Sequence, residues 1–451
     1  MSRASSAFRM ASCAALVAAL GSCGGQGDAP KAESPEGPIA YGQHTDGRGW
    51  AVREEGLFGH RRVLDLPNSP ESAPRGQNLG VLGYAQGSEN APATTGVLVR
   101  QTARMAPGLN LMNSGDAAEA VLMDSEGTVK HAWRLPYDDI PDAPPLATSF
   151  QIPWRRVHMR PDGSLLAMHS DAALVYVDRK SKLRWTLFDR VHHDLDVLEG
   201  PGGPTIFALA RRERIVPEVN PDQPVIDDLI IRVNARGEKT LTVSLWDAFT
   251  SSEWAPMLER LNEREDDVMH ANSLEILDEH EAALFKNPAV RAGSALVCMR
   301  NLDLVAVIDL EASKMVWVTS GPDRPHWRGA HDPTLTDRGE ILIFDNLGGV
   351  GGNSRLVALE PGARSANWTW AGDPAESFSS MFCGTLDALP GGNILATESC
   401  HGRAIEIDRA SGEIVWEFVS ERVAGDDEEF VAALFEVQRI PRPDWLASSS
   451  K

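Results

Sequence analysis

The sequence predicts an all-β fold, a six-bladed β-propeller, from three observations. Six β-rich stretches each end in a tryptophan: Trp133, Trp185, Trp246, Trp317, Trp370 and Trp416. Four of them share one pattern, an apolar run followed by an acidic turn, a Gly or Ser and then Trp, and residues 404–416 are the clearest copy. The tryptophans recur roughly every 46 to 71 residues. Repeats of this length, built from short strands and tight turns, are typical of blades arranged around an axis.

Composition is compatible with one large closed domain and excludes some partners. The chain has 451 residues, of which 42% are hydrophobic, enough to fill the core of a propeller. Its net charge of -21 repels nucleic acid and acidic membrane surfaces, so no nucleic-acid partner is expected. For the same reason, a site that binds an anion must be a local cluster of positive groups.

Residues 1–22 are predicted to be a lipoprotein-type signal peptide. Two arginines precede the apolar stretch Met10–Leu20, which is too short to span a bilayer. The sequence Leu20-Gly21-Ser22-Cys23 resembles a bacterial lipobox, and this resemblance implies that Cys23 is lipidated. An ordinary secretory signal with a chance cysteine is the alternative.

The next two segments lead from this signal into the propeller. Residues 23–45 are rich in Gly, Pro, Ala and Glu and are predicted to be a disordered tether. Because residue 24 is Gly rather than Asp, a lipidated chain is expected on the outer membrane, facing the periplasm. Residues 46–107 form an N-terminal segment that contains the strand Gly96–Arg100 and either pairs with the first blade or forms a small cap.

The propeller itself is predicted to occupy residues 108–451. Its six blades are expected at Gly108–Trp133, His158–Trp185, His193–Trp246, His270–Trp317, His331–Trp370 and Cys383–Trp416. A late strand, either Glu429–Val431 or Leu434–Val437, would complete the first blade and close the ring. Residues Asp247–Met269 have apolar residues at helical spacing and predict a small helical insert on the rim.

Three cysteines follow Cys23. Cys383 and Cys400 flank a predicted hairpin that turns at residues 390–393. If Leu389 faces Ile394, the two cysteines lie directly opposite each other, and we expect them to form a disulfide. A slip of one residue in register would separate them. Cys298 would remain a buried free thiol.

Histidines recur where consecutive blades begin, and they carry the prediction of function. They occur in His192-His193-Asp194, His270-Ala271-Asn272 and His331-Asp332, and Arg300 follows the strand after His270. Innermost strands of a propeller converge on the axis, so these side chains are expected to share one axial pocket. Each taken alone has a structural explanation, such as a hydrogen-bonded turn or an exposed strand residue.

The ordered set of these phrases resembles the bacterial arylsulfotransferase family, the PAPS-independent kind with a six-bladed propeller. The resemblance spans residues 80–416 and is carried by five phrases: residues 192–198, 269–273, 299–301, 330–332 and 389–393. It implies transfer of a sulfuryl group from one phenol sulfate to another phenol, through a sulfated histidine. No cofactor is implied, and no Gly-rich phosphate loop followed by Lys and Ser or Thr is present in the sequence.

The resemblance also implies roles for four residues. The nucleophile falls on His331, the sulfate-binding arginine on Arg300, and the supporting histidines on His270 and one of His192 or His193, of which we favour His193. A neutral imidazole is a good nucleophile, and an arginine offers a planar fork to sulfuryl oxygens. The chain departs from the better-studied members of the family in its shorter spacings, its predicted lipid anchor and the lack of a matching short-loop disulfide.

Other classes of function remain as alternatives. The tryptophan repeats also resemble those of pyrroloquinoline-quinone-type propellers, some of which are non-catalytic outer-membrane lipoproteins that assemble other proteins. A metal site built from the three histidines with Asp194 or Asp332 is a further alternative, although an arginine within the cluster repels a cation. The sequence leaves open the donor, the acceptor and the oligomeric state.

Overall fold

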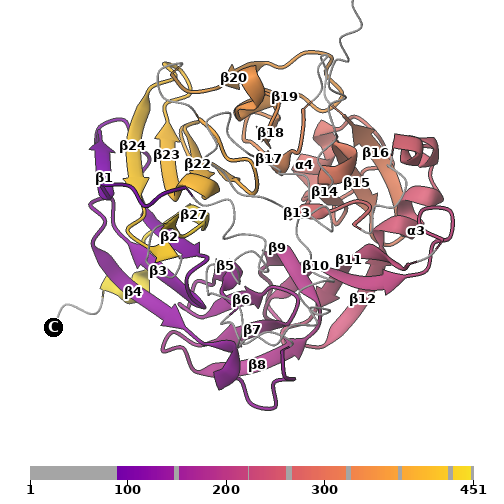
Figure 1. Cartoon of the computed structure of the whole chain (residues 1–451), viewed down its shortest axis with the longest axis horizontal. Coiled ribbons are helices and arrows are strands. Elements are labelled where there is room, and N and C mark those ends of the chain that lie inside the picture. Colours follow the sequence, from indigo (N-terminus) through magenta and orange to yellow (C-terminus); the bar gives the residue numbers. More distant parts are fainter. Residues whose placement is uncertain are drawn as a thin grey trace, which may run out of the picture. The chain divides into compact units, whose positions relative to one another are not determined.

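Six antiparallel sheets stand around a central axis, each forming one blade of a propeller (Figure 1). The predicted all-β, six-bladed fold is therefore confirmed. The computed structural model describes residues 89–146, 152–221, 223–260, 267–320, 327–373, 378–424 and 430–447. The predicted signal peptide, Cys23, the tether and residues 46–88 of the N-terminal segment lie outside the described residues.

Each blade has four strands, which follow one another from the axis outward. Blade 1 contains β27 (Leu434–Ile440), β2 (Leu109–Ser114), β3 (Glu119–Met123) and β4 (Val129–Arg134). Blade 2 contains β5 (Trp154–Met159), β6 (Leu165–His169), β7 (Ala173–Val177) and β8 (Leu183–Phe188). Blade 3 contains β9 (Val191–Leu198), β10 (Thr205–Arg214), β11 (Val225–Val233) and β12 (Lys239–Ser244).

The remaining three blades repeat this arrangement. Blade 4 contains β13 (Ala271–Ile276), β14 (Ala295–Met299), β15 (Leu304–Asp309) and β16 (Lys314–Thr319). Blade 5 contains β17 (His331–Leu335), β18 (Ile341–Asp345), β19 (Arg355–Leu359) and β20 (Trp368–Trp370). Blade 6 contains β21 (Thr385–Ala388), β22 (Ile394–Glu398), β23 (Arg403–Ile407) and β24 (Ile414–Val419).

The ring is closed by the late strand β27, which pairs antiparallel with β2 and so completes blade 1. This confirms the second of the two predicted closing strands, since Phe430–Val431 (β26) instead pairs with Val423–Ala424 (β25). The strand β1 (Gly96–Arg100) of the N-terminal segment pairs with β24. It therefore extends blade 6 as a fifth strand, where the sequence predicted pairing with the first blade or a cap.

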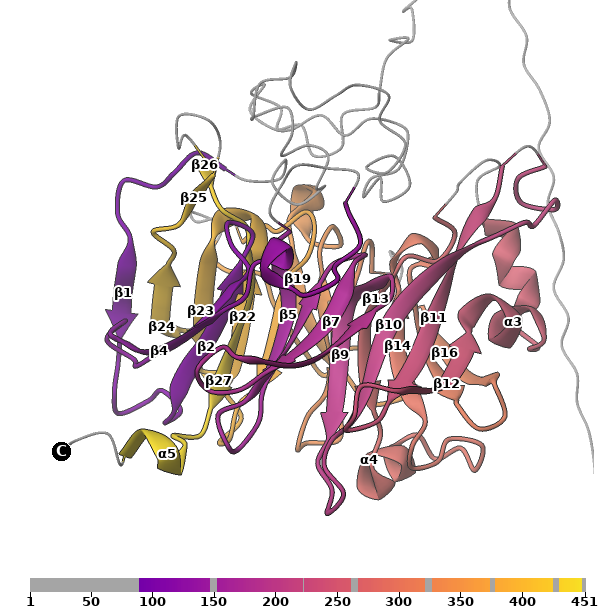
Figure 2. The ribbon, with the colours of Figure 1, turned by 90° about the horizontal axis from the view of Figure 1, so that it is seen from below.

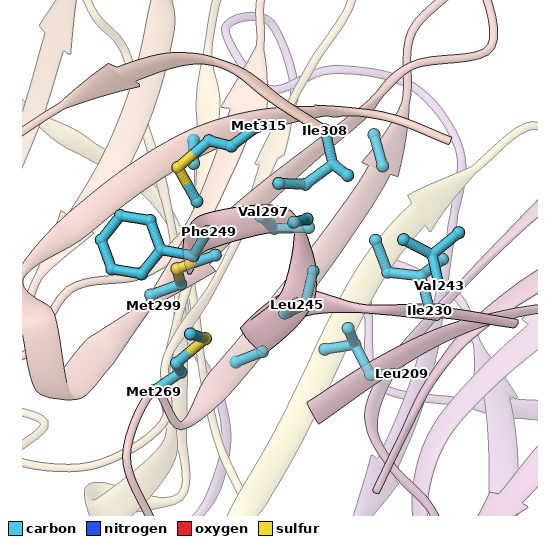
Figure 3. Packing of buried hydrophobic residues seen from close by; sticks show 14 of the residues in the cluster. Leu209, Ile230, Val243, Leu245, Phe249, Met269, Val297, Met299, Ile308 and Met315 are labelled. Carbon is cyan, nitrogen blue, oxygen red and sulfur yellow. The ribbon is translucent and has the colours of Figure 1, made fainter. Parts of the chain in front are cut away.

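The core lies between the blades. Six hydrophobic clusters each fill the space between two neighbouring blades. Figure 3 shows the cluster between blades 3 and 4, in which Leu209 and Ile230 of blade 3 lie near Val297 and Ile308 of blade 4. Apolar side chains on both faces of each sheet are buried in this way, which explains the continuous burial of inner strands such as β14 and β15.

Four of the six repeated tryptophans each join one blade to the next. The indole N–H groups of Trp133, Trp185 and Trp370 donate to the backbone carbonyls of Gly163, Ala235 and Gly412, at 3.0, 3.1 and 2.9 Å. Trp416 donates to the carbonyl of Ser125 at 3.0 Å and so joins the last blade to the first. These bonds tie the outer strand of one blade to a tight turn of its neighbour.

Trp246 departs from this pattern. It lies in α3 (Leu245–Thr250), because the strand β12 ends at Ser244, whose side chain accepts from the N–H of Asp247 and caps the helix. Together with the 3-10 turn η4 (Ala255–Arg260), α3 forms the predicted helical insert. Trp254 and Met257 of this insert pack against the core between blades 3 and 4.

The other helical elements are short. They are α4 (Glu279–Leu284), α5 (Asp444–Ala447), η3 (Tyr137–Asp139), η5 (Arg300–Leu302), η6 (Val350–Gly352) and η7 (Ser399–His401). Figure 2 shows α4 and α5 at one end of the blades and β25 and β26 at the other. Among the described residues, no helix is long and apolar enough to cross a membrane.

The register of the β21–β22 hairpin differs from the prediction by one residue. Ala388, not Leu389, pairs with Ile394, because the turn holds residues 389–393 and is closed by the Leu389 N–H donating to the carbonyl of Asn393 at 2.9 Å. Cys383 and Cys400 are consequently offset. Both are buried free thiols in one small apolar cluster, so the predicted disulfide is absent from the structure. Cys298 is a buried free thiol, as expected.

Candidate functional site

All six blades contribute a side chain to the end of the axis where the inner strands begin. This is the end at which β26 leads into β27, whereas α4 follows β13 at the opposite end (Figure 2). From blade 1 to blade 6 the side chains are those of Phe435, Arg155, His193, His270, His331 and Cys383. All six residues are at least nine-tenths buried. The structure thus brings the three predicted histidines together.

The ring of side chains is linked by direct contacts. The imidazoles of His193 and His270 have centroids 4.8 Å apart. Arg155 donates to the Cys383 thiol at 3.6 Å, and its guanidinium lies 4.8 Å from the centre of the Phe435 ring. The side chain of Asn346 connects His331 to Cys383, because it contacts both the His331 ring and the backbone of Cys383.

His331 is held in one tautomer by two oxygen atoms. Its Nδ1 lies 2.9 Å from the carbonyl oxygen of Gly329 and 2.8 Å from Oδ1 of Asn346. The amide of Asn346 is oriented in turn, because its Nδ2 donates to the carbonyls of Ser380 and Cys383 at 2.6 and 2.5 Å. Two acceptors at Nδ1 require the proton to be on that nitrogen. The Nε2 of His331 therefore carries the lone pair.

Burial keeps His331 neutral. Loss of solvent, followed by the charge of Arg300, holds the pKa of His331 well below its usual range. A neutral ring with a lone pair on Nε2 is the nucleophilic form of histidine. At neutral pH, the site needs no other base to prepare this residue.

His270 differs from His331 in having a carboxylate partner. Its Nδ1 lies 2.6 Å from Oδ2 of Asp267. Burial lowers the pKa of His270, while the charge of Asp267 acts in the opposite direction. An imidazole backed by a carboxylate can receive a proton and pass it on, since the carboxylate stabilises the charged ring.

His193, rather than His192, faces His270. Its Nδ1 lies 2.8 Å from Nδ1 of His192, whose Nε2 lies 3.1 Å from the carbonyl of Ala210 and 3.2 Å from Oδ1 of Asp228. These acceptors place a proton on Nε2 of His192, so its Nδ1 accepts from His193. His192 thus orients His193 from behind and leaves Nε2 of His193 as an acceptor.

Arg300 is held beside two of the histidines. It begins η5, directly after β14, and its backbone N–H donates to the carbonyl of His270 at 3.2 Å. Its side chain is buried, donates to Oδ1 of Asn301 at 3.0 Å and lies 6.0 Å from the centre of the Phe382 ring. Its charge contributes to the lowered pKa values of both His270 and His331.

Asp194 and Asp332 turn away from the histidines that precede them. Both bind Arg156, at 2.6 and 3.1 Å, and Glu436 binds the same guanidinium. Asp194 and Asp332 also accept from backbone N–H groups of the following blades, at Leu274 and Leu386. The two aspartates considered as metal ligands thus bind Arg156 and backbone N–H groups, and they do not face the histidines. They line a cavity of about 310 Å³ further along the axis, to which all six inner strands contribute residues.

Among the residues of the site that sequence reasoning missed are Asn346 and Arg155. Asn346 directly follows the second strand of blade 5, the same place that Arg300 occupies in blade 4, so a comparison of blades could have found it. Arg155 was missed because blade 2 was expected to begin at His158, whereas β5 begins at Trp154. The pair Arg155-Arg156 was therefore left outside the predicted blade.

Removing the amide that orients His331 should slow the reaction of the site. We expect Asn346→Ala to lower kcat by about 10- to 100-fold, because partners that fix a histidine ring typically contribute that much. The carbonyl of Gly329 still contacts Nδ1 of His331 in this variant. We therefore expect a smaller loss of kcat than from replacing His331 itself. Steady-state kinetics over a pH range would test this, because a purely structural role would change the amount of folded protein without shifting the pH profile.

Comparison with known proteins gives one family match. The model of the arylsulfotransferase (ASST) family matches residues 192–421, just over half of the 451 residues. Among curated proteins, none is significantly similar in sequence.

Several solved structures resemble this chain in fold. A protein of unknown function from Bacteroides caccae is 12% identical with a TM-score of 0.45, covering 74% of this chain and 100% of that chain. A virginiamycin B lyase from Staphylococcus aureus is 10% identical with a TM-score of 0.37, covering 73% of this chain and 89% of that chain. These likenesses concern the fold alone.

Proposed function

The chain belongs to the arylsulfotransferase (ASST) family, and from this premise we propose that it transfers a sulfuryl group from a phenolic sulfate ester to a phenolic acceptor without a nucleotide donor. The observation that carries the proposal is the tautomer of His331. Its Nδ1 faces two acceptor oxygens and its pKa is lowered by burial, so a neutral, nucleophilic Nε2 is available beside the buried cation Arg300.

In the first step, Nε2 of His331 attacks the sulfur of the donor. The N–S bond forms while the S–O bond to the phenol breaks, and the phenolate leaves with the bonding electron pair. Arg300 binds the sulfuryl oxygens. The leaving phenolate takes a proton from His270 where a preceding acceptor has left that ring protonated against Asp267, and from solvent where His270 is neutral. The Nδ1 proton of His331 stays in its hydrogen bond with Asn346, so the intermediate is an N-sulfonated imidazolium.

In the second step, the acceptor phenol takes the place of the first. Its proton passes to His270 or His193, and its oxygen attacks the sulfur as the N–S bond breaks. Because the sulfonated ring is already an imidazolium, it leaves as neutral imidazole without further protonation. Dividing one difficult transfer into two easier ones is the advantage of a covalent intermediate.

The test is acceptor-dependent turnover by the purified protein. With 4-nitrophenyl sulfate as donor, the release of 4-nitrophenol should increase with the concentration of phenol, and phenyl sulfate should form in equal amount. Initial rates at several phenol concentrations should give the parallel reciprocal plots of a ping-pong reaction. No turnover across a panel of aryl sulfates and phenols would instead favour a non-catalytic scaffold that assembles other proteins.

We further propose that the protein is exported and attached to the outer membrane through a lipid on Cys23, facing the periplasm. The lipobox-like sequence before Cys23 supports this. Cys23→Ser should move the protein from the membrane fraction to the soluble fraction of cells, and incorporation of labelled palmitate should be lost. Equal membrane association of the variant and the wild type would contradict lipid anchoring.

A further inference from the structure

Arg155 lies in the site but outside the region that carries the family match. It is the second residue of β5 in blade 2, whereas the match begins at residue 192. Only 3% of its surface is exposed. A buried guanidinium keeps its charge, because the pKa of arginine is far above neutral, and it acts on its surroundings through a medium that screens poorly.

Contacts with two described residues show where this charge lies. The guanidinium donates to the Cys383 thiol at 3.6 Å and lies 4.8 Å from the centre of the Phe435 ring. Cys383 belongs to blade 6 and Phe435 to blade 1, so Arg155 reaches from blade 2 across the end of the axis. The face of an aromatic ring supports a guanidinium and limits its movement.

The neighbouring arginine makes the role of Arg155 clearer. Arg156 points into the axial channel, where Asp194, Asp332 and Glu436 match its charge. Consecutive strand residues face opposite ways, and Arg155 accordingly contacts Cys383 and Phe435 at the histidine end. Arg156 therefore places its guanidinium in the axial channel, while Arg155 places its guanidinium at the histidine end.

Arg155 and Arg300 act on the same small region from different blades. Both charges oppose the burial effect on the pKa of the Cys383 thiol, and that of Arg155 also contributes to the lowered pKa of His193. Arg300 enters from blade 4 beside His331, and Arg155 enters from blade 2 on the other side of His193. An anion at the centre of the ring would thus lie between two guanidinium groups.

We propose that Arg155 is a second anion-binding residue of this site and binds the sulfuryl oxygens of the donor together with Arg300. This deepens the proposed function and rests on it. A sulfuryl group has three oxygens, and one guanidinium fork binds two of them at most. A second guanidinium from another direction engages the third and attracts the anion to a protein whose net charge is -21.

Calorimetric titration of the purified full-length protein with sodium sulfate tests the proposal without requiring turnover. Arg155→Gln should weaken sulfate binding on the order of 10- to 100-fold, the range expected from a lost hydrogen bond to a charged group. Arg236→Gln is the matched control, because it removes the same charge from an exposed turn. Its sulfate affinity should equal that of the wild type.

A second variant distinguishes the loss of an anion-binding group from a folding defect. Arg155→Lys keeps the charge but loses the fork and should bind sulfate with intermediate affinity, while its thermal unfolding midpoint shows whether the blade is intact. In turnover assays, Arg155→Gln should raise the KM for 4-nitrophenyl sulfate as well as lower kcat.

The outcomes separate the two proposals. Sulfate affinity that is equal in Arg155→Gln and wild type, or no saturable sulfate binding by the wild type, overturns the role of Arg155. Sulfate binding that is lost in Arg155→Gln in a protein without sulfuryl transfer would keep the anion site and overturn the proposed function.

Discussion

Replacing His331 by asparagine is expected to lower kcat for sulfuryl transfer by about 10³-fold or more, the scale of loss when a nucleophile is removed. Asparagine is similar in size to the ring and remains polar, so the inner end of β17 should keep its fold. It offers no lone pair of comparable nucleophilicity at the position of Nε2. The covalent route is then closed, and the bound donor and acceptor would have to react directly.

Two measurements make this prediction specific. Wild-type protein mixed with donor alone should gain the mass of one sulfuryl group on the peptide that contains His331, and the variant should not. His280→Asn provides the matched control, because His280 is exposed on α4 at the opposite end of the axis. Full activity in His331→Asn would leave the enzyme in place but assign the nucleophile to another residue.

Among the substitutions proposed for this protein, Arg156→Met should cause the largest loss of free energy of unfolding. Arg156 joins Asp194, Asp332 and Glu436, which come from blades 3, 5 and 1. Without the guanidinium, three buried carboxylates would face one another with no opposite charge between them. Breaking a buried ion pair by removing one partner typically costs about 3–5 kcal/mol, and we expect a loss of free energy of unfolding of that size.

The loss should depend on pH in a defined direction. Burial raises the pKa of Asp194 to about 6 and that of Glu436 to about 7, above the values of about 4 for unfolded chains. The native state therefore binds more protons between about pH 4 and pH 7, and this contribution to stability is lost as pH rises through the native values. The wild type should unfold less easily at pH 5 than at pH 8, and Arg156→Met should show a larger difference.

Urea unfolding of wild type and Arg156→Met at pH 5 and pH 8 checks both statements. Arg156→Lys serves as the control, since lysine keeps the charge but reaches fewer carboxylates and should be intermediate. A variant that loses as much stability at pH 5 as at pH 8 would show that the packing of the side chain, rather than its charge, stabilises the axis.

Much of this architecture could be predicted because blades repeat. The spacing of tryptophans and acidic turns indicated six blades, and Leu434–Val437 was one of two late segments predicted to close the ring. The histidines at the beginnings of inner strands indicated the axial site. These features are local in sequence, so one pattern repeated several times is enough to define them.

The details that failed depend on single residues. Ser244 ends β12 and starts α3, so Trp246 is helical despite its place in the repeat. One extra residue in the turn at 389–393 offsets Cys383 from Cys400. Arg155 and Arg156 look alike in sequence, and only their contacts distinguish an arginine in the site from one that joins three blades. The alternation of residues along a strand predicts which face of the sheet a side chain lies on. It does not predict which residues of other blades that side chain contacts across the axis.

The strand that closes the ring determines when the axial pocket can assemble. β27 is synthesised after every other blade strand, yet it forms the inner strand of blade 1 and carries Phe435, against which Arg155 packs. Until residues 434–440 have reached the compartment in which the protein folds, blade 1 has an open edge and the axial pocket lacks one of its walls. The chain is therefore unable to assemble the pocket before this last strand arrives.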